Sequence, residues 1–291
     1  MKIIRVHPMF AAEVTELAIT ADMPQAEIDR IKNAIEDEGV ICVRGQQAMT
    51  DDDQIAFCSR FGALQKSISL HREDTARRMK RDELTDLSNV AADGSKIAEN
   101  DTRRLIQLPG RLWHSDNSFR SPPGLYTFLA AKIVPPEGGD TEFADMRAAY
   151  DALDEATKAR IDGLQTVHSL GWSREQVGAP PLSEGERKNI GEAVQPLVRF
   201  HQRSGRKSLY LSSHARDVVG MSEIDGKALL RELTEFATQP QFVYRHKWRD
   251  GDFVMWDNRI TMHRATPFPE DKYQRDMRRT SIEDHEAAIA A

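Results

Sequence analysis

Leu112-Trp113-His114-Ser115-Asp116-Asn117-Ser118-Phe119 is the stretch that best indicates the fold and chemistry of this 291-residue chain. It places an imidazole and a carboxylate two residues apart, and this His-x-Asp spacing occurs once in the sequence. In an extended segment, side chains at i and i+2 leave the same face with roots about 6 to 7 Å apart, so both can reach one metal ion. We therefore expect His114 and Asp116 to be two ligands of one site. A second histidine would complete the 2-His-1-carboxylate set that leaves half of an iron(II) coordination sphere open.

The composition narrows the class of protein. The net charge of −6 gives no basic field, so it disfavours nucleic acid and anionic membranes as partners and favours a small molecule. Cys42 and Cys58 lie among apolar residues without a CxxC spacing, which predicts buried reduced thiols and a cytoplasmic location. Uncharged apolar runs stay well short of the roughly 18 residues that span a bilayer, so we expect a soluble protein.

The order of helix and strand patterns predicts the fold class. Apolar residues at three- and four-residue steps predict an amphipathic helix that ends before Gly39, and Val40-Ile41-Cys42-Val43 then has the pattern of a buried strand. A second helix with Thr50 as N-cap follows. Many short strands come later, at residues 125–134, 197–200, 208–211, 242–248, 253–256 and 277–282. We expect an α+β, mainly β fold: a double-stranded β-helix (jelly roll) with flanking helices, forming a single domain over residues 1–291.

The region of residues 67–111 is polar and irregular, and a long loop near a metal motif is a candidate active-site lid. Its densest basic cluster is Arg77-Arg78-Met79-Lys80-Arg81. An anion-binding patch is one interpretation. Because acidic residues flank the cluster on both sides, a solvated surface is the favoured one.

The third ligand has to come from the remaining histidines, and His263 has the most distinctive surroundings. It ends a strand-turn-strand unit that contains Trp256-Asp257-Asn258. The pattern alone leaves His263 open between a metal ligand and a packed core histidine. Downstream, residues 275–280 have a strand pattern that places Arg275 and Arg279 on one face. Two inward guanidinium groups would require bound anions, whereas an edge strand would leave both faces in water.

These residues, in this order, resemble the pattern of the taurine/2,4-dichlorophenoxyacetate dioxygenase family of iron(II)- and 2-oxoglutarate-dependent oxygenases. The pattern is His-x-Asp, a Thr or Ser, a distal His and an Arg. Here 24 residues separate Asp116 from Thr141, 121 separate Thr141 from His263, and 11 separate His263 from Arg275. Gly138-Gly139-Asp140-Thr141 is also similar to the family's own sequence. The resemblance covers nearly the whole chain.

The resemblance implies a role for each matching residue. The implied iron ligands are His114, Asp116 and His263. Thr141 and Arg275 would bind the distal carboxylate of 2-oxoglutarate, and Arg279 would bind the anionic head of the primary substrate while Arg278 points away. Asn89, Trp113 and His71 match positions near the substrate pocket. The implied cofactors are Fe(2+), 2-oxoglutarate as co-substrate and O2.

Residues 112–116 and 141–153 are most similar to the aryloxyalkanoate-degrading branch of the family. This similarity implies hydroxylation beside the ether oxygen of a compound such as 2,4-dichlorophenoxyacetate, which then separates into a phenol and a 2-oxo acid, with release of succinate and CO2. The alternatives are the same chemistry on a sulfonate such as taurine, a sulfate ester or another small carboxylate, and a non-enzymatic metal-binding jelly-roll module. The presence of Asp116 favours oxygen transfer over halogenation. Relatives commonly associate, so a homo-oligomer is consistent with the resemblance.

Overall fold

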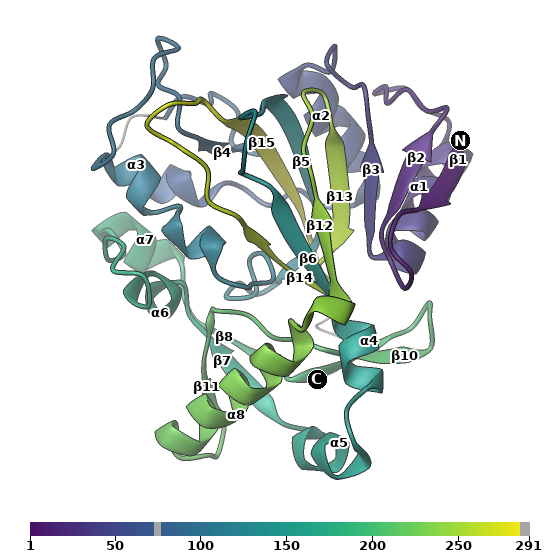
Figure 1. The fold of residues 1–291 in the computed structure, drawn as a ribbon. Coiled ribbons are helices and arrows are strands. Elements are labelled where there is room, and N and C mark those ends of the chain that lie inside the picture. The colour runs from purple at the N-terminus through teal and green to yellow at the C-terminus, as the bar shows by residue number, and fades with distance from the viewer. Residues whose placement is uncertain (73–76, 286–291) are drawn as a thin grey trace.

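The largest element of the fold is a seven-stranded sheet (Figure 1). The computed structural model describes residues 1–72 and 77–285 of the chain. Neighbouring strands of the sheet run antiparallel, except that the second and third strands are parallel. Across the sheet the order is β1 (Lys2–Arg5), β2 (Ala12–Thr15), β3 (Val40–Val43), β13 (Phe253–Asp257), β5 (Gly124–Ile133), β15 (Asp276–Glu283) and β4 (Thr85–Ser88).

Both faces of the centre of this sheet are buried, and the alternation of side chains along β3 shows how. Ile41 and Val43 belong to one apolar cluster, and Val40 and Cys42 belong to another. Successive side chains of a strand point to opposite faces, so the two clusters lie on opposite sides of the sheet. The continuous apolar run predicted for this strand is therefore a strand covered on both sides.

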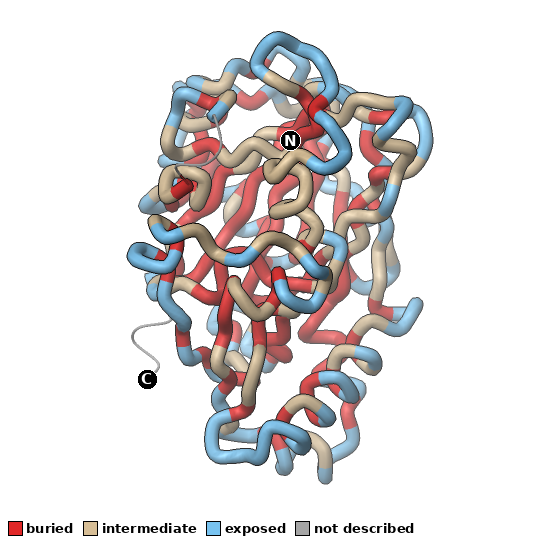
Figure 2. Tube along the Cα trace, turned by 90° about the vertical axis from the view of Figure 1, so that its left-hand side faces the viewer, coloured by how far each residue is buried: buried red, intermediate tan, exposed pale blue. Residues whose placement is uncertain are grey.

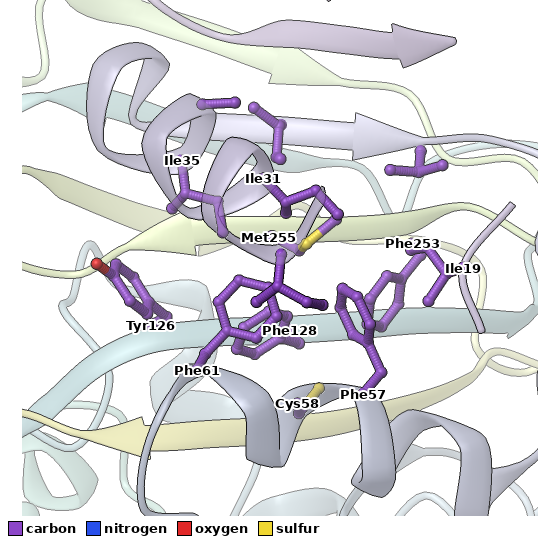
Figure 3. Packing of buried hydrophobic residues seen from close by; sticks show 14 of the residues in the cluster. Ile19, Ile31, Ile35, Phe57, Cys58, Phe61, Tyr126, Phe128, Phe253 and Met255 are labelled. Atoms are coloured by element: carbon purple, nitrogen blue, oxygen red, sulfur yellow. The ribbon is translucent and has the colours of Figure 1, made fainter. Parts of the chain in front are cut away.

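Two helices cover the first face, α1 (Gln25–Glu38) and α2 (Asp51–Cys58), with the short η1 (Ser59–Phe61) following α2. The helix α1 ends at Gly39, whose φ of 74° suits glycine, as the sequence predicts. Thr50 caps α2 in a capping box with Asp53. Figure 3 shows the aromatic rings that fill the space between helix and sheet, among them Phe57 and Phe128, whose centroids are 6.2 Å apart.

A smaller sheet lies against the opposite face. Its strands are β12 (Val243–His246), β6 (Thr141–Asp145) and β14 (Thr261–Ala265), in that order. The ring of Phe143 on β6 packs edge-on against Trp256 on β13, with 5.4 Å between centroids. This contact brings the two sheets face to face.

The remaining strands and helices form the lower part of the molecule in Figure 1. The helix α8 begins after its cap Ser222 and buries Leu229, Leu230 and Leu233 on one stripe. The elements here are β7 (Gln165–His168), β8 (Ala193–Pro196), β9 (Val198–His201), β10 (Arg206–Leu209), β11 (Ala215–Val218), α4 (Met146–Asp151), α5 (Glu155–Ile161), α6 (Leu170–Glu175), α7 (Glu184–Asn189), α8 (Glu223–Ala237) and η4 (Pro240–Phe242).

Residues 67–111 contain only short elements, as expected: η2 (Ile68–His71), β4, α3 (Thr102–Leu105) and η3 (Leu108–Arg111). Residues 73–76 of this region lie outside the described residues. Figure 2 shows a buried interior of strands beneath loops that are exposed or half-buried. The chain is thus a mixed helix-and-sheet fold. Within residues 1–72 and 77–285, none of the helices combines the length and apolar character that crossing a bilayer requires.

Candidate active site

His114, Asp116 and His263 converge at one point between the sheets. The backbones of His114 and His263 exchange two hydrogen bonds of 3.0 and 2.9 Å, an isolated bridge that sets the two rings side by side. The Nε2 atoms lie 3.8 Å (His114) and 3.6 Å (His263) from the Asp116 carboxylate. One donor atom from each residue lies within 4.8 Å of the other two, and all three residues are buried. The structure therefore brings together the three residues that the family resemblance implies as metal ligands.

The hydrogen bonds of the site leave one nitrogen of His114 free to face Asp116. Its Nδ1 lies 2.7 Å from the carbonyl oxygen of Leu112, and because a carbonyl only accepts, Nδ1 carries the proton and Nε2 keeps its lone pair. The Asp116 carboxylate is held by Thr127, whose Oγ1 donates to Oδ2 at 2.9 Å. The backbone of Asp116 is held as well, because its N–H donates to Asn258 Oδ1.

Burial makes the two histidines neutral. It lowers the pKa of the His114 imidazole and lowers that of His263 to about 3, with the neighbouring imidazole as a further cause for His263. Burial alone would raise the pKa of the Asp116 carboxyl, but Arg279 and the two imidazoles outweigh it and hold that pKa well below its usual range. Two neutral nitrogen donors and one carboxylate fit a divalent transition metal. Among the described residues, the buried Nδ1 of His263 has no hydrogen-bond partner.

Two other groups of metal-ligand type occur in the described part of the chain, and they differ from this one. They are Cys42-His246-Asp252 and Glu36-His201-Asp257. Both ring nitrogens of His246 already have polar partners, Tyr244 and Asp252, and an arginine, Arg44, pairs with Asp252. In the second group Arg259 pairs with both carboxylates. Neither group is among the residues that line the cavity at His114 and Asp116.

A cavity of about 190 Å³ opens at His114 and Asp116. His214 also lines it, with its ring 6.0 Å from that of His114 and its Nδ1 2.9 Å from Ser173 Oγ. Sequence reasoning passed over His214 because a histidine in a Ser-Ser-His turn carries no distinctive signal. Much of the rest of the wall is apolar: Ile68, Met79, Val90, Ile97, Ile106, Phe119 and Leu170.

The basic cluster of residues 77–81 supplies part of this wall. Arg78 pairs with Asp86 and Asp276, which holds Met79 against the cavity with only 9% of its surface exposed. Arg81 is exposed and pairs with Asp52. The prediction of a solvated surface holds for Arg81 but is wrong for Met79, because the ion pairs of Arg78 fasten the segment to the sheet.

Arg279 reaches the site from β15. Its Nη1 lies 2.5 Å from Asp116 Oδ1, and it lines the cavity. Its neighbour Arg278 pairs with Asp276 and lies 3.5 Å from Asp51, on the other face of the strand. The predicted separation of the two arginines is present in the structure.

Arg275 immediately precedes β15, which starts at Asp276. The pairing of β15 with β4 keeps one register from Asp276 to Arg279, and the shift in its pairing with β5 comes from the extra residue Lys132 on β5. That Arg275 shares a strand face with Arg279 stays a prediction. Arg275 lines a second cavity of about 280 Å³. Burial lowers the pKa of its guanidinium to about 10, against the opposing effect of Glu270 and Asp140.

Thr141 begins β6 directly after the turn that meets Arg275. A Cβ on Gly139 would lie 3.5 Å from the Cδ of Arg275, so the turn and the arginine are in contact there. The hydroxyl of Thr141 accepts a hydrogen bond of 3.0 Å from the indole N–H of Trp248. The indole of Trp248 therefore fixes the hydroxyl of Thr141, two residues along the chain from the Gly139 turn that contacts Arg275.

The three other predicted pocket residues do not line the first cavity within the described residues. Asn89 lines the second cavity, and its amide binds the backbone of Arg275 at 2.8 Å and of Tyr273 at 2.9 Å. The ring of Trp113 stacks under the guanidinium of Arg264, 4.7 Å away. His71 lies in η2, where its carbonyl accepts a hydrogen bond from Ser183. Their roles in substrate binding stay predictions.

A buried 2-His-1-carboxylate set beside a cavity, held between facing sheets, is what a non-haem metal-dependent oxygenase requires. The chain belongs to the family described as "Taurine catabolism dioxygenase TauD, TfdA family", whose model matches residues 2–281. The predicted resemblance is confirmed, and the chain is an enzyme, a 2-oxoglutarate-dependent dioxygenase.

Individual relatives are similar over almost the full chain. The α-ketoglutarate-dependent 2,4-dichlorophenoxyacetate dioxygenase of Burkholderia sp. (strain RASC) is 42% identical over 94% of this chain and 92% of its own length. The protein of that name from Cupriavidus pinatubonensis (strain JMP 134 / LMG 1197) is 41% identical over 96% of each chain. The crystal structure of AAD-2 in complex with Mn(II) and N-oxalylglycine superposes with a TM-score of 0.90, at 40% identity and 97% coverage of both chains.

Proposed function

We propose that this enzyme hydroxylates an aryloxyalkanoate such as 2,4-dichlorophenoxyacetate, with Fe(2+) held by His114, Asp116 and His263. The observation that supports it best is the make-up of the first cavity, where His114, Asp116 and Arg279 lie beside an apolar wall. A substrate with one carboxylate and one aromatic ring matches both parts. The 42% and 41% identities to 2,4-dichlorophenoxyacetate dioxygenases support the same substrate class.

Different residues bind the two organic anions, 2-oxoglutarate and the primary substrate. In the proposal, Arg275 and Thr141 bind the distal carboxylate of 2-oxoglutarate, and Arg279 binds the carboxylate of the primary substrate. A divalent metal with Asp116, Arg275 and Arg279 has three net positive charges. The two carboxylates of 2-oxoglutarate and the single carboxylate of the substrate neutralise all three, and balanced charge is what a buried site requires.

The proposed reaction consumes O2 and 2-oxoglutarate and releases succinate and CO2. When bound, the iron supplies the redox chemistry, in which one oxygen atom enters succinate and the other enters the substrate. The chain's own residues place the substrate carbon beside the ether oxygen next to the metal ligands and exclude water with the apolar wall. Hydroxylation at that carbon gives a hemiacetal, whose C–O bond then breaks to leave a phenol and a 2-oxo acid.

We also propose that the chain is one double-stranded β-helix domain with flanking helices. The large sheet and the β12-β6-β14 sheet, facing each other across Phe143 and Trp256, support a double-stranded β-helix with flanking helices. Hydrophobic clusters connect the first strands with the last, which supports a single domain over residues 1–291.

Oxygen uptake tests the proposed function. The purified protein should consume O2 only when Fe(II), 2-oxoglutarate and 2,4-dichlorophenoxyacetate are all present, with one phenol released per succinate. Taurine, an alkyl sulfate and a simple carboxylate serve as competing substrates in parallel assays. Coupled uptake with one of these, and none with the aryloxyalkanoate, would show that the proposed substrate class is wrong. Absence of 2-oxoglutarate-dependent uptake with every substrate would count against the proposed site itself.

A further inference from the structure

The short helix η2 (Ile68–His71), near the start of residues 67–111, lies with its backbone against the backbone of α7. Gly185, in the first turn of α7, is so close to His71 that a Cβ there would lie 2.3 Å from the His71 carbonyl oxygen. The hydroxyl of Ser183 donates to the same carbonyl at 3.2 Å. Real Cβ contacts of this length do not occur, so any side chain at position 185 would push η2 away from the helix.

A buried cluster of charges joins the same two segments to α6. Glu186 accepts from Arg72 Nη1 at 3.0 Å and from both terminal nitrogens of Arg174, at 2.8 and 2.7 Å. The backbone N–H of Ser183 donates to the same carboxylate. The side chains of Arg72, Arg174 and Glu186 are 3%, 4% and 0% exposed. The Glu186 carboxylate therefore pairs with two guanidinium groups away from water, and its loss would remove this partner from both of them.

These contacts hold one wall of the first cavity in place. Ile68 of η2 packs on a small apolar cluster that contains Phe119 and Leu170, and all three line the cavity. They come from three separate stretches of the chain, so local structure alone does not bring them together. The Gly185 contact holds η2, which carries Ile68, and the Glu186 cluster is part of the same wall, because Arg72, Arg174 and Glu186 also line the cavity.

We propose that Gly185 and Glu186 are positioning residues that fix the wall formed by Ile68, Phe119 and Leu170, and that this wall determines the size of aromatic ring the enzyme accepts. The inference rests on the proposed function for the identity of the substrate. Neither residue touches the metal ligands. Their effect is therefore on the binding and alignment of the ring, and not on the binding of 2-oxoglutarate.

The first test compares Gly185→Ala with Gly171→Ala. Gly171 lies in α6, where a Cβ would meet its nearest neighbour at an ordinary 3.7 Å. For Gly185→Ala we expect the KM for 2,4-dichlorophenoxyacetate to rise about tenfold or more, because a ring misplaced by a fraction of an ångström is aligned poorly. The KM for 2-oxoglutarate should stay at the wild-type value. The ratio of kcat/KM for naphthoxyacetate to that for phenoxyacetate should rise, because the wall has moved outward. Gly171→Ala should match the wild type in all three.

The second test removes the charge at position 186 and follows the wall directly. Glu186→Gln is compared with Glu36→Gln, which breaks a buried pair with Arg259 away from the cavity. Hydrogen exchange of the amides of residues 68–72 should be faster in Glu186→Gln and unchanged in Glu36→Gln. Exchange needs no substrate, so it decides whether the cluster fixes the wall even if aryloxyalkanoates are not turned over, an outcome that would refute the proposed function alone.

The proposal is wrong if hydrogen exchange of residues 68–72 is the same in Glu186→Gln and the wild type. It is equally wrong if a folded Gly185→Ala enzyme keeps the wild-type KM and ring selectivity. A general disturbance of the active site would raise the KM for 2-oxoglutarate as well, and that result would assign both residues a purely structural role and overturn the proposal.

Discussion

The Nη1 nitrogen of Arg279 lies 2.5 Å from the Oδ1 oxygen of Asp116, although 163 positions separate the two residues in the chain. The strand β15 carries the arginine across the sheet to the His-x-Asp stretch. Arg279, which the family resemblance assigns to the primary substrate, is therefore adjacent to Asp116, which the resemblance assigns to iron. In the proposed function, a substrate carboxylate bound by Arg279 would lie beside the metal ligand Asp116, which would set the position of the reacting carbon.

Arg279→Ala should weaken binding of the primary substrate by about 2 to 5 kcal/mol, the usual cost of removing one partner of a desolvated charge pair. The matched control is Arg278→Ala, because Arg278 is the next residue but pairs with Asp276 on the opposite face. Steady-state KM values for 2,4-dichlorophenoxyacetate measure the difference. Equal KM values for the two variants would show that Arg279 does not bind the substrate.

Arg275→Ala should weaken 2-oxoglutarate by a similar amount, about 2 to 5 kcal/mol, because the guanidinium is buried and would pair with the distal carboxylate. Calorimetric titration of the metal-loaded protein with 2-oxoglutarate gives the dissociation constant. Arg279→Ala should bind 2-oxoglutarate nearly as the wild type does. Normal binding by both variants would show that the arginine roles are wrongly assigned.

Replacement of His114, Asp116 or His263 by Ala should each abolish stoichiometric metal binding. His246→Ala should retain it, because both nitrogens of His246 are engaged with Tyr244 and Asp252 in a different group. Metal content after dialysis, measured by atomic spectroscopy, distinguishes the two groups. Full metal content in the three ligand variants, or loss in His246→Ala, would place the metal elsewhere.

His168 should make the folded state lose stability in acid. It is fully buried between Ser118 and Thr166, and burial lowers its pKa from 6.5 to about 3. Between these values the unfolded chain binds a proton that the folded chain does not, so this contribution is complete above pH 6.5 and falls by about 1.4 kcal/mol per pH unit below it.

Denaturant unfolding of the wild type and His168→Gln at several pH values isolates this effect, because the other titrating groups are common to both. The difference in unfolding free energy between them should shrink as the pH falls from 7 toward 5. A difference that stays constant with pH would contradict the buried neutral state of His168.

Local patterns determined several parts of the fold. The helix that ends at Gly39, the strand Val40–Val43 and the stripe of α8 all follow from residues close in sequence. The pairing of His114 with Asp116 also follows from spacing, because i and i+2 residues stay near each other in any extended segment. The family resemblance then supplied His263, which the pattern alone left open.

Tertiary structure alone decided the rest. Arg275 is buried beside the turn at Gly139, and the turn carrying His214 reaches the cavity wall, only after the chain has folded. Ile68, Phe119 and Leu170 form one wall because a glycine and a buried carboxylate on α7 hold distant segments together. Spacing along the sequence fixes distances over a few residues. Strand register and side-chain packing fix the long-range distances, and these depend on contacts among segments that are far apart in the chain.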